Sequence, residues 1–149
     1  LHHKLKYGVA VHREYSDRLP QVSVYGGELN QVWTNLIDNA IDAMDGKGEL
    51  TIRTAQENNC ILVEIIDNGA GIPPEIQSRI FEPFYTSKGI GKGSGLGLDI
   101  SRNLMELMQG SISLYSAGND EGTTVKIWIR RLVRSCLIVP ELSQIQRSL

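Results

Sequence analysis

The sequence has few cysteines, no long apolar run and no excess of positive charge. Its two cysteines, Cys60 and Cys136, form no pair with metal-ligand or redox spacing, so we expect free thiols in a reducing compartment. No apolar run is long enough to cross a bilayer, and no signal peptide points to export. The net charge of −2 disfavours a nucleic-acid-binding or membrane-surface protein, because such proteins carry a basic excess.

What the sequence does contain is typical of one globular domain. Its 149 residues can enclose a proper core, and 41% of them are hydrophobic and 21% charged. The first residue is Leu1 and not Met, so we expect a fragment of a longer protein. We see no internal repeat.

Apolar periodicity predicts an α/β two-layer fold without strict βαβ alternation. Strands are expected at 7–15, 22–25, 49–55, 60–66, 111–116 and 123–129. Helices are expected at about 28–44, 74–81 and about 96–108, with a turn at Gly26–Gly27. The strand at 60–66 is apolar at nearly every position, which predicts cover on both faces. The tail from 131 to 149 could pack somewhere or form a loose end.

A glycine-rich segment precedes the last predicted helix. The stretch KGIGKGSGLGLDISRNL, residues 88–104, has five glycines in nine positions and then continues as an amphipathic helix. Bare backbone N–H groups at a helix start form an anion-binding loop. A P-loop is excluded because Gly93 follows Lys92, and a dinucleotide fingerprint is excluded because the glycines keep a period of two. A linker would have no reason to continue into a helix, so we favour a phosphate-binding loop.

Two further stretches point to a nucleotide. The predicted helix 28–44 carries Asn35 and Asn39 opposite its apolar face, although asparagine is a poor helix former. An amide oxygen suits Mg²⁺ that bridges to phosphate, whereas a solvated polar face is the ordinary alternative. In DNGAGIP, 67–73, Asp67 ends a buried strand, where a carboxylate needs a donor such as the adenine amino group. Taken alone, this stretch is more often a plain turn.

Together these stretches resemble the catalytic ATP-binding domain of two-component sensor histidine kinases, within the GHKL superfamily. The matching segments are ELNQVWTNLIDNAIDAM (28–44, N box), DNGAGIP (67–73, G1 box), IFEPFYTSK (80–88, F box), GKGSGLGLDIS (91–101, G2 box) and GNDEGTTVKIWI (118–129). The resemblance covers about residues 5–130 and is closest to the nitrogen-regulator type. It implies a Bergerat fold, in which a mixed, mostly antiparallel sheet packs against about three helices, with a mobile ATP lid.

The resemblance also implies a role for each matching position. Asn39 would bind Mg²⁺, Asn35 would lie near the triphosphate, and Asp67 would accept from the adenine amino group, with Gly69 and Gly71 shaping the slot. Lys88 and Ser94 would contact phosphate, and Asn35 and Lys88 are the expected catalytic residues. Phe81 and Phe84 would anchor the hinge of the lid, and Thr123 would bind adenine through water. The remaining expected nucleotide contacts are Asp42, Ile72, Phe84, Thr86, Gly93, Gly95, Leu96, Gly97 and Leu98.

Two positions depart from related patterns. Gyrase-like, mismatch-repair and chaperone ATPases carry a glutamate where this chain has Asn35, so the general base for hydrolysis is missing. ATP would then serve phosphoryl transfer to a residue from elsewhere. Many histidine kinases have a lysine where this chain has Asp42, which leaves charge neutralisation to Lys88 or Lys92.

No histidine of this chain fits the phosphoacceptor pattern. The family places that histidine before an acidic residue on a separate two-helix domain, whereas His3 precedes Lys4 and His12 precedes Arg13. We therefore expect residues 1–130 to be the kinase half alone, with the dimerisation domain absent. The implied cofactors are ATP and Mg²⁺. The implied partners are that dimerisation domain and a response regulator, with a monomeric, cytoplasmic chain and membrane attachment only through upstream segments.

Two other functions remain open at this stage. The chain could be a nucleotide-binding switch that binds ATP and a protein partner without transferring phosphate. It could also be a GHKL-type ATPase, which Asn35 disfavours.

Overall fold

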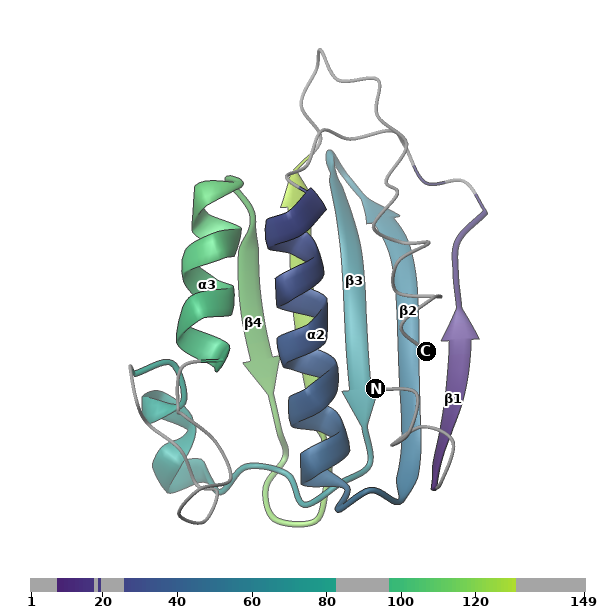
Figure 1. Cartoon of the computed structure of the whole chain (residues 1–149), viewed down its shortest axis with the longest axis vertical. Coiled ribbons are helices and arrows are strands. Elements are labelled where there is room, and N and C mark those ends of the chain that lie inside the picture. The colour runs from purple at the N-terminus through teal and green to yellow at the C-terminus, as the bar shows by residue number, and fades with distance from the viewer. Residues whose placement is uncertain (1–7, 18, 20–25, 83–96, 131–149) are drawn as a thin grey trace.

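The computed structural model describes residues 8–17, 19, 26–82 and 97–130. In chain order its elements are β1 (Val9–Glu14), α2 (Gly26–Ala43), β2 (Gly48–Glu57), β3 (Cys60–Asp67), η1 (Pro74–Arg79), α3 (Gly97–Leu107), β4 (Ser111–Tyr115) and β5 (Thr123–Arg130). Figure 1 shows α2 and α3 side by side on one face of the sheet. The expected two-layer α/β fold is confirmed.

The five strands form one mixed sheet in the order β1-β2-β3-β5-β4. Only the β1–β2 pair is parallel, and the other three pairs are antiparallel. The two central antiparallel pairs follow from the hairpin at residues 58–59 and from the return of β5 between β3 and β4. This return places Asp67, the last residue of β3, directly opposite Thr123, the first residue of β5.

Helix α2 supplies the largest part of the core. Its apolar residues recur every three or four positions, so they form one stripe that packs on the sheet. The buried members are Leu29, Val32, Trp33, Leu36, Ile37, Ala40 and Ile41. They meet inward-facing residues of β2, β3 and β5, and Met105 of α3 joins the same cluster. The opposite stripe of α2 therefore faces away from the sheet with its asparagines.

Three predicted boundaries need correction. The turn expected at Gly26–Gly27 is the first turn of α2, because no Cβ contact or positive φ opposes helix at Gly27. The segment 74–81 is a 3-10 helix that ends at Arg79, which suits its short length and its proline at the start. The turn between β2 and β3 is only Asn58–Asn59, since β2 continues to Glu57 and not to 55 as predicted. The predicted strand 22–25 lies outside the described residues.

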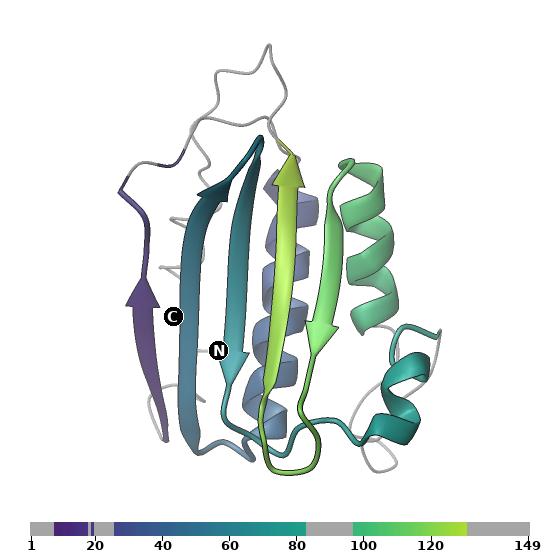
Figure 2. The same cartoon turned by 180° about the vertical axis from the view of Figure 1, so that it is seen from behind.

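The sequence predicts that β3 is covered on both faces, and every residue of this strand is buried or partly buried. Seen from behind, the sheet shows a face on which no described helix lies (Figure 2). Leu62 points to this face and is still only 3% exposed. Its cross-strand partners are Ala55 and Trp128, so neighbouring side chains of the sheet itself provide the cover.

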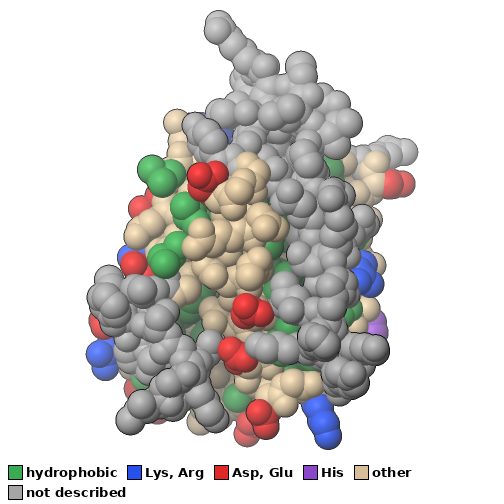
Figure 3. All heavy atoms as spheres, in the orientation of Figure 1, with side chains coloured by type: hydrophobic (Ala, Val, Ile, Leu, Met, Phe, Trp, Pro, Cys, Tyr) green, Lys and Arg blue, Asp and Glu red, His purple; other side chains and the backbone are tan. Residues whose placement is uncertain are grey.

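Two groups of side chains are visible on the helix side (Figure 3). Hydrophobic side chains gather over α3, whose Leu107 is 73% exposed. Acidic side chains lie over the C-terminal half of α2. That half carries Asp38 and the exposed Asp42 on either side of Asn39. No described helix has the length and apolar character needed to cross a membrane.

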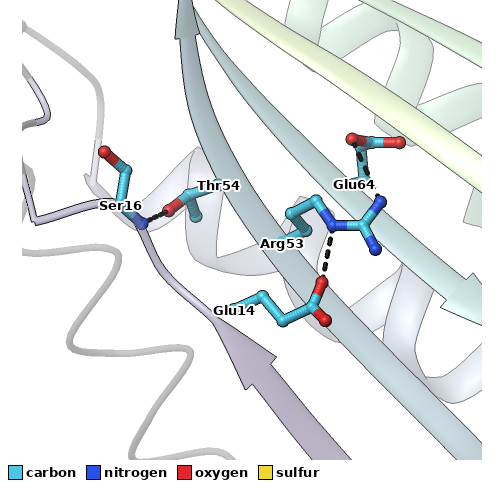
Figure 4. Close-up of polar contacts among 5 residues, drawn as sticks. All are labelled: Glu14, Ser16, Arg53, Thr54 and Glu64. Carbon is cyan, nitrogen blue, oxygen red and sulfur yellow. Dashed lines mark hydrogen bonds and ion pairs between the residues drawn. The ribbon is translucent and has the colours of Figure 1, made fainter.

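Side-chain contacts hold the parallel edge strand β1 to β2 (Figure 4). Arg53 Nε donates to Glu14 Oε2 over 2.6 Å, and its guanidinium also lies 3.9 Å from a Glu64 oxygen. The backbone N–H of Ser16 donates to the Thr54 hydroxyl over 2.8 Å. Arg53 thus links three adjacent strands, since Glu14, Arg53 and Glu64 share one register row.

Candidate functional site

The first residue of α3 lies beside the asparagine stripe of α2. A Cβ built on Gly97 would lie 3.8 Å from Asn39 Nδ2 and 3.9 Å from Asn35 Cβ. The Asn35 amide donates to the Gly97 carbonyl and to the Ser101 hydroxyl, both over 3.4 Å. Ser101 is fully buried and donates to the Gly97 carbonyl over 2.7 Å. The structure therefore joins the end of the glycine segment to the asparagine helix, which are 62 residues apart in sequence.

The carboxylate of Asp67 is buried at the end of β3. Asp67 is 7% exposed, and its Oδ1 accepts from the Gly69 N–H over 2.9 Å. Burial raises the pKa of Asp67, and backbone hydrogen bonds from Gly69 and Thr123 oppose that shift. Burial of a carboxylate is unfavourable unless donors satisfy it, and among the described residues the Gly69 and Thr123 backbone N–H groups do so in part.

The 67–73 loop is fitted against the C-terminal end of α2. The Ala70 N–H donates to the Ala43 carbonyl over 2.9 Å, and a Cβ on Gly69 would collide with that same carbonyl. Gly71 has φ +72° and a Cβ there would collide with the Gly118 carbonyl. Both predicted glycines are therefore required by close backbone approach.

The 67–73 and 116–122 loops are joined by several hydrogen bonds. Two backbone bonds run from the latter to the former: Asp120 N–H to the Ala70 carbonyl, 2.6 Å, and Gly122 N–H to the Gly69 carbonyl, 3.2 Å. The Ile72 N–H donates in return to the Ser116 hydroxyl over 2.9 Å. The sequence interpretation missed Ser116, although a serine at a strand end before a glycine turn is a common backbone-binding position.

The two groups of side chains lie at different points along α2. Asn35 and Asn39 lie in its second half, whereas the 67–73 loop meets Ala43 at its end. Residues 35 and 43 are about 12 Å apart along a helix axis. The arrangement suits an elongated ligand that has an amino-bearing ring at one end and an anionic group at the other.

Other predicted residues take the following positions. Thr123 is buried opposite Asp67, Leu98 packs partly against the core, and Asp42 is exposed on α2. The ring of Phe81 lies 5.1 Å below the guanidinium carbon of Arg102, which links the end of the η1 segment to α3. Several predicted residues lie outside the described part of the chain, namely Phe84, Thr86, Lys88, Lys92, Gly93, Ser94, Gly95 and Leu96.

The side chains of the described residues form no metal cage by themselves. Among the described residues, no group of three or more His, Cys, Asp or Glu side chains is arranged to hold a metal ion. Asn39 nevertheless offers a neutral amide near the start of α3. One protein ligand suits Mg²⁺ that is held mainly by water and phosphate oxygens.

Residues 26–132 match the family described as histidine kinase-, DNA gyrase B-, and HSP90-like ATPase. The sensor kinase CckA of Brucella abortus is 37% identical over 122 residues, covering 72% of this chain and 13% of that protein. The sensory histidine kinase/phosphatase NtrB of Vibrio alginolyticus is 37% identical over 120 residues, covering 72% of this chain and 34% of that protein. The chain therefore corresponds to one part of these longer relatives.

Solved structures agree with these sequence matches. The nucleotide-free catalytic domain of histidine kinase ThkA superimposes with a TM-score of 0.76 at 27% identity, covering 87% of this chain and 84% of that one. The mycobacterial sensor histidine kinase MprB gives a TM-score of 0.72 at 26% identity, covering 82% and 81%. The chain belongs to the histidine kinase-, DNA gyrase B- and HSP90-like ATPase family, as an ATP-binding domain of the sensor histidine kinase type.

Proposed function

We propose that this chain binds Mg-ATP along α2 and transfers the γ-phosphoryl group to a histidine on a separate dimerisation domain. The observation that carries this proposal is the meeting of Gly97 with Asn35 and Asn39, at a distance along α2 from the buried Asp67 carboxylate. The proposed pathway is two-component signalling in the cytoplasm, with a response regulator as the next acceptor.

Asp67 is assigned to the adenine end of the nucleotide. Its carboxylate accepts from the exocyclic amino group, and the two backbone donors at Gly69 and Thr123 hold it in place. Ile72 and Thr123 complete this end, and Gly69 and Gly71 allow the ring to approach the backbone.

Asn39 and Asn35 are assigned to the phosphate end. Asn39 is the proposed Mg²⁺ ligand, and the bound ion would offset the phosphate charge beside Asp38 and Asp42. Asn35 holds the first turn of α3, whose backbone N–H groups favour an anion. Lys88, Thr86, Phe84 and the glycines before Gly97 are proposed to close over the nucleotide.

The absence of a carboxylate at Asn35 favours transfer over hydrolysis. A neutral amide cannot remove a proton from water, and Asn35 already donates toward α3. Phosphoryl transfer depends mainly on positioning and charge neutralisation, and Mg²⁺ and Lys88 are the proposed sources of positive charge.

The test mixes the full chain with Mg-[γ-³²P]ATP and a dimerisation domain from a similar sensor kinase. We expect acid-labile label on the histidine of that domain. A matched domain with histidine replaced by glutamine is the control. ATP binding without transfer would favour a nucleotide switch, and steady phosphate release without transfer would favour an ATPase; either result would overturn the kinase assignment.

A further inference from the structure

Two side chains that have no role in the proposed function, those of Gln77 and Ser116, form a polar cluster around the backbone of Ile72. Gln77 of η1 donates from Nε2 to the Ile72 carbonyl over 2.9 Å and to the Ser116 carbonyl over 3.1 Å. Ser116 in turn accepts from the Ile72 N–H over 2.9 Å. Both backbone polar groups of Ile72 are thus held, one by the hydroxyl of Ser116 and one by the amide of Gln77.

The Ser116 hydroxyl has no spare bonding capacity. A serine hydroxyl donates one proton and offers two lone pairs. Its proton is directed to the Gly122 carbonyl over 2.8 Å, and it accepts from Ile72 and, over 3.3 Å, from the Gly118 N–H. Ser116 is buried, so water cannot replace these partners.

Gln77 is similarly specific in its chemistry. Only a group with two N–H donors can serve the Ile72 and Ser116 carbonyls at once. Gln77 lies two residues before Arg79, the end of η1, and the chain continues directly to Phe81 beneath Arg102 of α3. The cluster therefore connects three segments: the 67–73 loop, the 116–122 loop and the segment that leads toward α3.

We infer that Gln77 and Ser116 form a latch that positions the 67–73 loop and thereby sets the selectivity for adenine. The nucleotide in this inference is the one assigned under the proposed function, on which the inference rests. Neither residue is among those assigned to the base. The latch acts through Ile72, which lies in the same loop as Gly69, and the Gly69 N–H holds the Asp67 carboxylate. A loop released from the latch would still fold, but its carboxylate would no longer meet the amino group at a fixed distance.

The first test needs no nucleotide. Amide hydrogen exchange of the full chain reports on the Ile72 N–H in wild type, Ser116→Ala and Gln77→Glu. Glutamate keeps the shape of Gln77 but, when ionised, presents oxygen to two carbonyls. We expect exchange at Ile72 to accelerate about tenfold or more in both variants. Exchange at Val63 in the core should be unchanged. Exchange at Ile72 equal to wild type would overturn the latch.

The second test measures base selectivity. Calorimetric titration with Mg-ATP and with Mg-GTP gives the ratio of the dissociation constant for Mg-GTP to that for Mg-ATP. We expect that ratio to fall about fivefold to tenfold in Ser116→Ala and Gln77→Glu, because ATP binding depends on the carboxylate position. A general loss of stability would weaken both nucleotides alike and leave the ratio unchanged, which would overturn the selectivity role.

Matched controls use the same substitutions elsewhere. Ser113 lies on the exposed side of β4, and Gln56 lies at an exposed position of β2. The control variants are Ser113→Ala and Gln56→Glu. Both should behave as wild type in both measurements. If the wild-type chain binds neither nucleotide, the proposed function fails and the selectivity role fails with it. The exchange of the Ile72 amide still decides whether the latch exists.

Discussion

The 67–73 loop and the first turn of α3 both approach α2, but contacts of different quality hold them. Around the loop the backbone hydrogen bonds to α2 and to the 116–122 loop are 2.6 to 3.2 Å long. At the start of α3 the Asn35 amide reaches its two acceptors only at 3.4 Å, beyond the usual range. A Cβ would collide with backbone at Gly69 and Gly71, but would lie 3.8 Å from its nearest described neighbour at Gly97.

This contrast indicates that the two ends of the site differ in how rigidly the protein holds them. The end assigned to adenine is built by the protein alone, with glycines and a buried carboxylate held in fixed positions. At the end assigned to phosphate, the described hydrogen bonds from Asn35 are longer and the space around the Gly97 Cβ position is ordinary. Selectivity would then come from the first end and adaptation to the triphosphate from the second.

The largest expected effect is at Gly71. Gly71→Ala forces a Cβ against the Gly118 carbonyl at a φ of +72°, which should lower the free energy of unfolding by about 3 kcal/mol. Urea unfolding of the full chain measures it. Gly27→Ala is the control, because nothing described lies within 4 Å of its Cβ. If Gly71→Ala stayed within about 0.5 kcal/mol of wild type, the 67–73 loop would not be the rigid end.

The next effect concerns the phosphate end. Asn39→Ala removes the proposed Mg²⁺ ligand, so the dissociation constant for Mg-ATP should rise about tenfold to a hundredfold. Calorimetric titration in the presence and absence of Mg²⁺ measures this loss. Affinity for ATP in EDTA should change little. Asn103→Ala, at an exposed position of α3, is the control. Equal losses with and without Mg²⁺ would contradict a metal role for Asn39.

Acid should act oppositely on stability and on ATP affinity at the adenine end. Burial raises the pKa of Asp67, so on acidification the folded state takes up this proton before the unfolded state does. Between that raised pKa and the ordinary value of about 3.9, the contribution of Asp67 to the free energy of unfolding therefore increases as pH falls. ATP affinity should decrease over the same range, because the charged acceptor is lost.

The Asp67→Asn variant isolates this effect from other carboxylates. The variant should be slightly more stable than wild type near neutral pH, since a buried charge is gone, and should bind ATP about tenfold more weakly. Subtracting its pH profiles of unfolding and of ATP binding from those of wild type leaves the contribution of Asp67. Asp45→Asn, at an exposed turn, serves as the control. If the pH profiles of wild type and Asp67→Asn were parallel in both measurements, Asp67 would be only a turn residue.

The smallest expected effect is at Gly97. Gly97→Ala has ordinary space for its Cβ and lies in a helix, where alanine is favoured over glycine by about 1 kcal/mol. The free energy of unfolding should therefore change by less than about 1 kcal/mol, in the stabilising direction, by urea titration. A loss as large as that of Gly71→Ala would show that both ends of the site are equally rigid.

Much of the fold was predictable because its signals are local. Apolar spacing predicted α2, α3, β2, β3, β4 and β5 to within a few residues. The errors arose where local signals were ambiguous. Gly26–Gly27 carried a turn signal but begins a helix, and the apolar pattern of the predicted strand 49–55 stopped two residues before β2 ends at Glu57.

The sequence by itself determined the family, the residue types of the site and the lack of a carboxylate at Asn35, because each is written in a contiguous motif. The tertiary structure alone decided that Gly97 lies against Asn39, that Asp67 faces Thr123, and that Ser116 and Gln77 hold Ile72. The physical reason is that these contacts join segments far apart in the chain. Strand order and backbone approach at glycines decide which of those segments meet, and no local pattern encodes that choice.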